Sequence, residues 1–90
     1  MSSRKLISVE RSIHVYDNDN ELIKEINVDA IPFEEIKGIV TPNEEDPLMY
    51  DGYELNESQL SKFQNFLSEK IVVDFNFYFY VLICLGVYES

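Results

Sequence analysis

Apolar and polar residues alternate along the first part of the chain, from residue 6 to residue 16. One face of this stretch carries four β-branched residues and one arginine, namely Ile7, Val9, Arg11, Ile13 and Val15. This period of two predicts a half-buried strand. The next four residues, Asp17-Asn18-Asp19-Asn20, are typical of a turn, and residues 21–28 then predict a second strand.

The register of this predicted hairpin follows from its loop. With residues 17–20 as the loop, Val15 faces Leu22 and Ile13 faces Lys24, so the apolar faces of the two strands agree. Arg11 and Lys24 interrupt the shared face. Their aliphatic stems can pack on it while the charged groups reach out at the edge.

Helical spacing follows the hairpin in two segments. Pro32 suits the first turn of a helix, and apolar residues recur after it at Phe33, Ile36, Ile39 and Val40, which predicts a short helix at 32–40. Residues 41–55 are expected to be irregular and acidic. A second helix is predicted to begin at Asn56, because Asn56 and Gln59 form a capping-box pattern. Its apolar stripe consists of Leu60, Phe63, Phe66 and Leu67.

The segment from Ile71 to Tyr88 is dense in aromatic and β-branched residues and predicts the last strand. One face carries Phe75, Phe77, Phe79, Val81, Ile83 and Leu85, and the opposite face carries Asn76, Tyr78, Tyr80, Leu82 and Cys84. Because both faces are largely apolar, this strand is expected at the centre of its sheet. The predicted fold is α+β, with a three-stranded antiparallel sheet, two helices packed on one face, and the order β-β-α-α-β.

The chain has 90 residues, which predicts a single domain spanning residues 1–90. Its longest apolar run, Phe77 to Leu85, is about half of the roughly 18 residues that a membrane helix needs. The first residues lack the apolar stretch of a secretory signal. We therefore expect a cytoplasmic protein with no membrane contact. The one cysteine, Cys84, excludes an internal disulfide.

Charge narrows the range of partners. Seventeen acidic and seven basic residues give a net charge of −10. Such a surface repels nucleic acid and anionic membranes and attracts basic proteins. An acidic composition that serves solubility alone is equally compatible with this balance.

The sequence offers no arrangement typical of catalysis or metal binding. His14 is the only histidine and lies on the face of the first strand that is expected to be exposed. A calcium loop that begins at Asp17 lacks the required glycine at Leu22 and the required glutamate at Val28. We therefore predict a binding protein rather than an enzyme, with no catalytic residue, no metal site and no cofactor. A small hydrolase that uses carboxylates alone is the alternative, and a panel of hydrolase substrates would reveal it.

Two surfaces are candidates for partner binding. Residues 44–57 interleave six acids with Leu48, Met49 and two tyrosines. Tyrosine is enriched at binding hot spots, and clustered acids steer a basic partner. The contact residues predicted here are Glu44, Glu45, Asp46, Tyr50, Asp51, Tyr53 and Glu54. In the alternative interpretation, the apolar side chains pack on the core and the acids are simply solvated.

Tyr78 and Tyr80 form the second candidate surface. If the helices cover the phenylalanine face of the last strand, both tyrosines are exposed and available to a partner. In the alternative, the helices cover the tyrosine face, or the sheet dimerises there.

Several stretches together resemble a known family. They are the strand Val-Glu-Arg-Ser-Ile-His-Val-Tyr at residues 9–16, the stretch Asp-Pro-Leu-Met-Tyr-Asp-Gly-Tyr-Glu-Leu at residues 46–55, the helix that contains Gln59-Leu60, and the Phe-Tyr-Phe-Tyr strand at residues 77–80 that ends near a cysteine. This pattern resembles small bacterial proteins that include immunity proteins of contact-dependent growth inhibition systems. The stretch at residues 46–55 is its most specific part.

The resemblance implies a cytoplasmic antidote that binds the toxic domain of a cognate effector and blocks its active site or substrate groove. Many such toxins are nucleases with basic clefts, which the charge of −10 would complement. We therefore expect an immunity protein with a basic toxin domain as its partner. The alternative is an acidic adaptor, encoded by a phage or a host, that mimics nucleic acid and binds a basic protein. The oligomeric state stays open.

Overall fold

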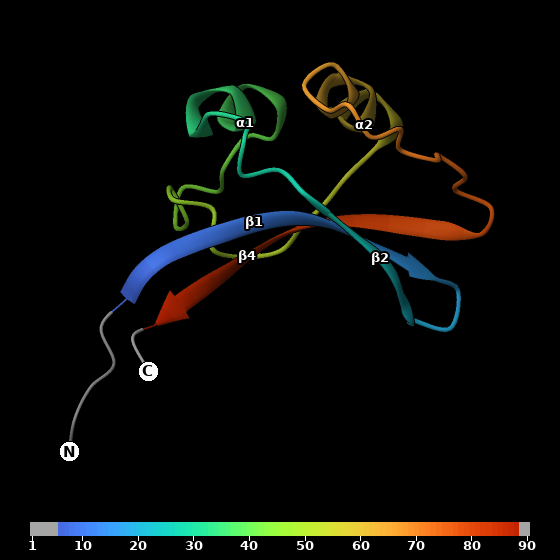
Figure 1. The fold of residues 1–90 in the computed structure, drawn as a ribbon, viewed down its shortest axis with the longest axis horizontal. Helices are drawn as coiled ribbons and strands as arrows, with labels where there is room; N and C mark the ends of the chain where they lie inside the picture. Colours follow the sequence, from blue (N-terminus) through green and yellow to red (C-terminus); the bar gives the residue numbers. More distant parts are fainter. Residues whose placement is uncertain (1–5, 89–90) are drawn as a thin grey trace.

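A four-stranded antiparallel sheet forms the frame of the protein in the computed structural model, which describes residues 6–88 (Figure 1). β1 (Leu6–Asp17) and β4 (Tyr78–Tyr88) pair at its centre. β2 (Leu22–Asn27) lies outside β1, and β3 (Tyr53–Glu54) lies outside β4, which gives the strand order β2-β1-β4-β3. The predicted α+β class, the antiparallel sheet and the central place of the last strand are confirmed.

β3 corrects the predicted number of strands from three to four. Tyr53 lies opposite Leu82 and Glu54 opposite Val81, and the sequence order becomes β-β-α-β-α-β. The backbone N–H of Leu55 extends the pairing by donating to the Tyr80 carbonyl at 2.8 Å. A strand of two residues is too short to show a period of two in its sequence. Only its position beside β4 defines it.

The hairpin of β1 and β2 has a register different from the predicted one. Ile13 lies opposite Ile26 rather than Lys24, and Val15 lies opposite Lys24. A slip of two residues leaves every side chain on its own face, because side chains in a strand alternate with a period of two. Ile13 and Ile26 therefore still share the buried face, as the apolar pattern required.

A β-bulge and a short loop cause this slip. Tyr16 pairs with Leu22 and Val15 pairs with Lys24, so Ile23 has no residue opposite it. At this bulge β2 therefore has one residue more than β1. The loop closes where the Asp17 N–H donates to the Glu21 carbonyl at 3.0 Å. Asn20 ends the loop in the left-handed conformation, at φ 62°, which asparagine tolerates better than most residues.

Both predicted helices are present and lie on the same side of the sheet (Figure 1). α1 (Phe33–Ile39) matches the predicted helix at 32–40 to within one residue at each end. α2 (Glu57–Gln64) begins at the predicted capping box: Asn56 Oδ1 accepts the Gln59 N–H at 2.8 Å, and Gln59 Oε1 accepts the Asn56 N–H at 2.9 Å. The stripe of α2 is shorter than predicted, because the helix ends before Phe66, which is 44% exposed.

The last strand begins later than predicted. Residues 71–77 are irregular rather than extended, and a turn there precedes β4. The Asp74 carbonyl accepts hydrogen bonds from the Phe77 and Tyr78 amides at 3.2 and 2.9 Å. Aromatic and β-branched residues favour strands, but here residues 74–77 form a turn. The Asp74 side chain stabilises this turn because it also accepts the Asn76 N–H at 3.1 Å.

The helices cover the tyrosine face of β4. An exposed tyrosine surface would have required them to cover the phenylalanine face instead. Leu82 lies opposite Ile13 and Tyr80 opposite Val15, so the tyrosine face packs beneath the helices. Tyr80 is 0% exposed, whereas Leu85 on the other face is 47% exposed. Periodicity could not choose between two apolar faces. The pairing with β1 decided it, because directly opposite residues share a face and only one face of β1 is apolar.

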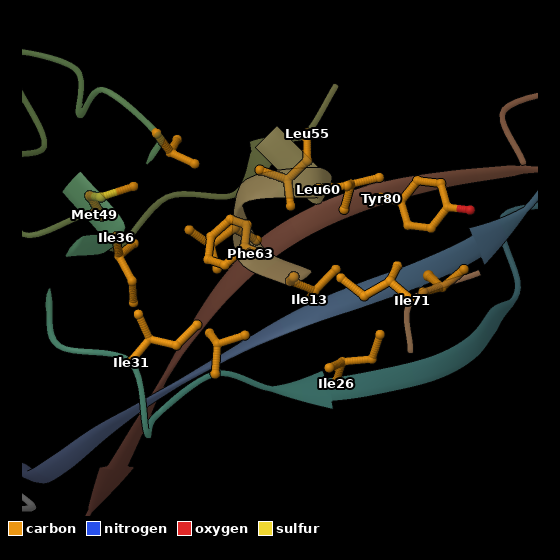
Figure 2. Close-up of a cluster of buried hydrophobic side chains, with 14 residues drawn as sticks. Ile13, Ile26, Ile31, Ile36, Met49, Leu55, Leu60, Phe63, Ile71 and Tyr80 are labelled. Atoms are coloured by element: carbon orange, nitrogen blue, oxygen red, sulfur yellow. The ribbon is translucent and has the colours of Figure 1, made fainter. Parts of the chain in front are cut away.

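One core lies between the sheet and the helices (Figure 2). The sheet contributes Ile13, Val15, Ile26, Tyr80 and Leu82, and the helices contribute Ile36, Leu60 and Phe63. Connecting segments add Val28, Ile31, Val40, Met49, Leu55 and Ile71. Neither of the two helices in residues 6–88 has the length and apolar character needed to cross a membrane.

Candidate functional site

The acidic segment, which we define as residues 44–54, follows α1 in the chain and ends with β3. Its exposed members include acidic, aromatic and aliphatic residues, namely Glu44, Glu45, Leu48, Tyr50, Asp51 and Glu54. Leu48 and Tyr50 are 49% and 50% exposed, which is high for such large side chains. The segment therefore presents the combination of acids and apolar groups that the sequence indicated.

The carboxylate of Asp46 holds the acidic segment in a fixed path. Its oxygens accept hydrogen bonds from the Tyr50 N–H at 2.8 Å, the Asp51 N–H at 2.9 Å and the Tyr53 hydroxyl at 2.7 Å. The Tyr53 oxygen also accepts the Asn43 N–H at 3.2 Å. Asp46 is only 7% exposed. In this structure the Asp46 oxygens stabilise the loop itself, and a contact between Asp46 and a partner stays a prediction.

The network keeps Asp46 ionised. Burial by itself raises the pKa of this carboxyl group, but hydrogen bonds from Asp51, Tyr53 and Tyr50 outweigh it, and the positive charge of Arg11 adds to them. The net pKa lies below the ordinary value of 3.8. Burial and the nearby charge of Asp46 raise the pKa of the Tyr53 hydroxyl above 10.0, so this hydroxyl remains a donor.

Two side chains anchor the acidic segment to the rest of the fold. Met49 is 1% exposed and has φ 56°, a left-handed conformation that costs roughly 1–3 kcal/mol outside glycine. Core burial and the Asp46 turn hold it there. The Arg11 guanidinium donates to the Leu48 carbonyl at 2.7 Å and lies 4.4 Å from the centre of the Phe33 ring. Sequence reasoning missed this role, because Leu48 is 37 positions away from Arg11.

The remaining predicted contact residues are distributed unevenly. Tyr53 is half-buried and bonded to Asp46, so it supports the segment rather than extending from it. Tyr80 is fully buried; its hydroxyl donates to the Val72 carbonyl at 2.6 Å and accepts the Asp74 N–H at 2.9 Å. Tyr78 is partly buried and packs against the core. The expected exposed tyrosine surface is therefore absent from β4.

His14 lies on the sheet face away from the helices, as expected, but its neighbours cover it to 7% exposure. Its Nδ1 lies 3.2 Å from the Tyr16 hydroxyl. Its Nε2 lies 3.1 Å from a Glu25 carboxylate oxygen, within ion-pair distance but without the angles of a hydrogen bond. The His14 ring therefore packs on the sheet between a tyrosine and a carboxylate.

The described residues offer little for metal binding. Within residues 6–88, no three or more histidine, cysteine or carboxylate side chains gather closely enough to hold a metal ion. An apolar pocket lies between β2 and the segment after α2 and is lined in part by Ile23, Ile26, Ile71 and Val72. A surface ion pair between Lys24 and Glu69, at 2.6 Å, lies beside it.

Taken together, the sheet, the helices and the fixed segment define a small acidic α+β domain with an exposed acidic surface. The chain belongs to the family described as a domain of unknown function, DUF7683, whose profile matches residues 10–82. This range begins in β1, contains the whole acidic segment and ends within β4. No curated protein and no solved structure is significantly similar to the chain.

Proposed function

We propose that this protein is an immunity protein that binds a basic bacterial toxin domain and covers its active-site or substrate groove. The class of toxin that we propose first is a nuclease. The observation that carries the proposal is the fixed acidic segment. Its exposed carboxylates at Glu44, Glu45 and Asp51 stand on a backbone that Asp46 holds in place. A surface that is ordered before binding loses less conformational entropy when the partner arrives.

Charge supports the same proposal at longer range. The net charge of −10 attracts a basic partner and speeds encounter, and Tyr50 and Leu48 offer apolar contact within the acidic surface. A carboxylate-rich loop is suited to a groove that otherwise binds phosphates. Binding, with no chemistry of its own, is therefore the activity that we propose.

The resemblance to immunity proteins supports the proposed function less strongly than the exposed acids do. Within the stretch at residues 46–55, Asp46, Met49 and Leu55 are buried and Tyr53 is half-buried. These residues build the loop, so the likeness supports a shared local fold. The functional proposal rests on the exposed acids between them.

The first experiment measures binding and toxicity together. The protein is mixed with the product of the neighbouring gene, at low and at moderate salt, and the activity of that product is assayed with and without it. We expect a one-to-one complex, loss of toxin activity, and association that slows markedly as salt rises. A neighbouring product that remains free and active at both salt concentrations would contradict the proposal.

Matched triple variants then test the acidic segment itself. Glu44→Gln, Glu45→Gln and Asp51→Asn together are expected to slow association about tenfold or more. The control carries the same change in charge on exposed residues elsewhere: Asp19→Asn, Glu21→Gln and Glu35→Gln. Equal effects of the two triples would show that net charge, rather than this segment, attracts the partner. A partner that is harmless but loses its nucleic acid on binding would favour the nucleic-acid mimic instead.

A further inference from the structure

The sheet face away from the helices carries a row of apolar side chains along β4. The row consists of Phe79, Val81, Ile83 and Leu85, which alternate with the residues that face the core. The first three are partly exposed and Leu85 is 47% exposed. Neither helix of the described residues lies on this side (Figure 1). The last strand is therefore apolar on both faces, and the helices within residues 6–88 cover only one of them (Figure 1).

Acids flank this apolar row on both sides. Glu54 on β3 lies opposite Val81, and Glu25 on β2 lies opposite His14, which itself lies opposite Val81. Glu10 lies opposite Leu85 near one end of the row. The basic residues within these strands, Arg11 and Lys24, lie opposite Cys84 and Val15 and so share the helix side of the sheet. The charged side chains that the described strands turn to the open face are thus all acidic.

The open face is continuous with the acidic segment. A Cβ atom on Gly52 would lie 3.3 Å from side-chain carbons of both Ile83 and Val81. Glycine at this position therefore lets the segment run beside the row without placing a side chain on it. The acidic segment therefore meets the row at Gly52.

The dimensions of the row fit a helix. From Phe79 to Leu85 the chain advances six residues, which in a strand is about 20 Å and equals the length of a helix of about 13 residues. Glu54 lies one strand to one side of β4 and Glu25 two strands to the other, a width of about 14 Å at the usual strand spacing. A helix with its side chains is about 10–12 Å wide.

We propose that the open face binds an amphipathic helix of the partner, with an apolar stripe on the β4 row and lysine or arginine residues along both flanks. The inference rests on the proposed function, since it identifies the part of the basic toxin that this protein recognises. A second copy of this chain fits less well, because its Glu10, Glu25 and Glu54 would approach the same acids of the first copy.

The test uses a defined probe and the full chain. A synthetic 14-residue helical peptide carries a leucine stripe flanked by lysines, and a scrambled peptide has the same composition and charge. Amide chemical shifts of the ¹⁵N-labelled protein report where each binds. We expect the helical peptide to shift residues 79–85 and Glu25 and to bind at least tenfold more tightly than the scrambled one.

Two pairs of substitutions complete the test. Val81→Thr with Ile83→Thr keeps β-branched side chains in the strand and is expected to weaken binding of the helical peptide about tenfold. Val72→Thr with Val73→Thr makes the same chemical change at exposed sites off the face and is expected to leave binding unchanged.

Three results would overturn the inference. They are equal affinity for the two peptides, shifts confined to residues 44–51, and a dimer in sedimentation that Val81→Thr with Ile83→Thr converts to monomer. Shifts confined to the acidic segment would leave the proposed function intact. If the peptide binds the open face as expected while the toxin stays active, the result supports the helix-binding face and contradicts the proposed function.

Discussion

Asp46 joins three donors of the acidic segment at one carboxylate. Replacing it with asparagine keeps the shape but removes the charge and turns an NH₂ group toward hydrogen-bond donors. We expect Asp46→Asn to lower the free energy of unfolding at neutral pH, measured by urea denaturation. Asp51→Asn serves as the control, because that carboxylate is exposed. Equal stability of the two variants would show that the Asp46 network does not hold the fold.

The same residue predicts a pH dependence. The pKa of Asp46 is lowered in the folded protein, so its stabilising effect is complete above the unfolded value of 3.8 and is lost as the pH falls through the lower folded pKa. The stability difference between the wild type and Asp46→Asn is therefore expected to shrink as the pH falls through the range below 3.8. A difference that stays constant across this range would contradict the assigned role of the charge.

Tyr80 shows how a hydroxyl can be accommodated in the core. Tyr80→Phe removes the bonds to the Val72 carbonyl and the Asp74 N–H while keeping the ring, and we expect a loss of about 1–2 kcal/mol in unfolding free energy. Tyr78→Phe makes the same change on a partly exposed neighbour and is expected to cost less. If both variants match the wild type, the hydroxyl contributes nothing to stability.

At the scale of elements, the capping box of α2 gives a quantitative prediction. Asn56→Ala removes the acceptor for the Gln59 N–H, and the loss of such a cap costs about 1 kcal/mol. Thermal or urea unfolding would measure this loss. Ser58→Ala, an exposed change within the same helix, is the control and is expected to be neutral or slightly stabilising. A helix that tolerates both substitutions equally would be held by packing alone.

At the scale of the whole molecule, the excess of acids opposes the folded state. A net charge of −10 on a chain of 90 residues produces self-repulsion that salt screens. We expect sodium chloride to raise the unfolding free energy by an amount on the order of 1 kcal/mol, equivalent to about 4–8 °C in Tm for a domain of this size. Sucrose at equal osmolality controls for effects unrelated to charge. A Tm that is constant with salt would mean that ion pairs such as Lys24–Glu69 already balance the repulsion.

Local signals in the sequence determined the helices, the two strands of the first hairpin and the exposed acids, but not the register of the hairpin. The α2 boundary was predictable because the Asn56 and Gln59 cap depends on residues three apart. The alternation in β1 fixed which of its faces is buried, and the exposure of Glu44, Glu45, Asp51 and Glu54 followed from their charge. These features depend on neighbours in the chain, so the chain alone encodes them.

Only the tertiary structure decided the features that depend on distant pairing. β3 exists because it meets β4, and β4 buries Tyr80 because Ile13 lies opposite Leu82. Asp46 became structural because Tyr53, seven residues later in the chain, returns to it. Periodicity reports how residues alternate along one strand, but an apolar strand with two similar faces needs its partner strand to select the buried one.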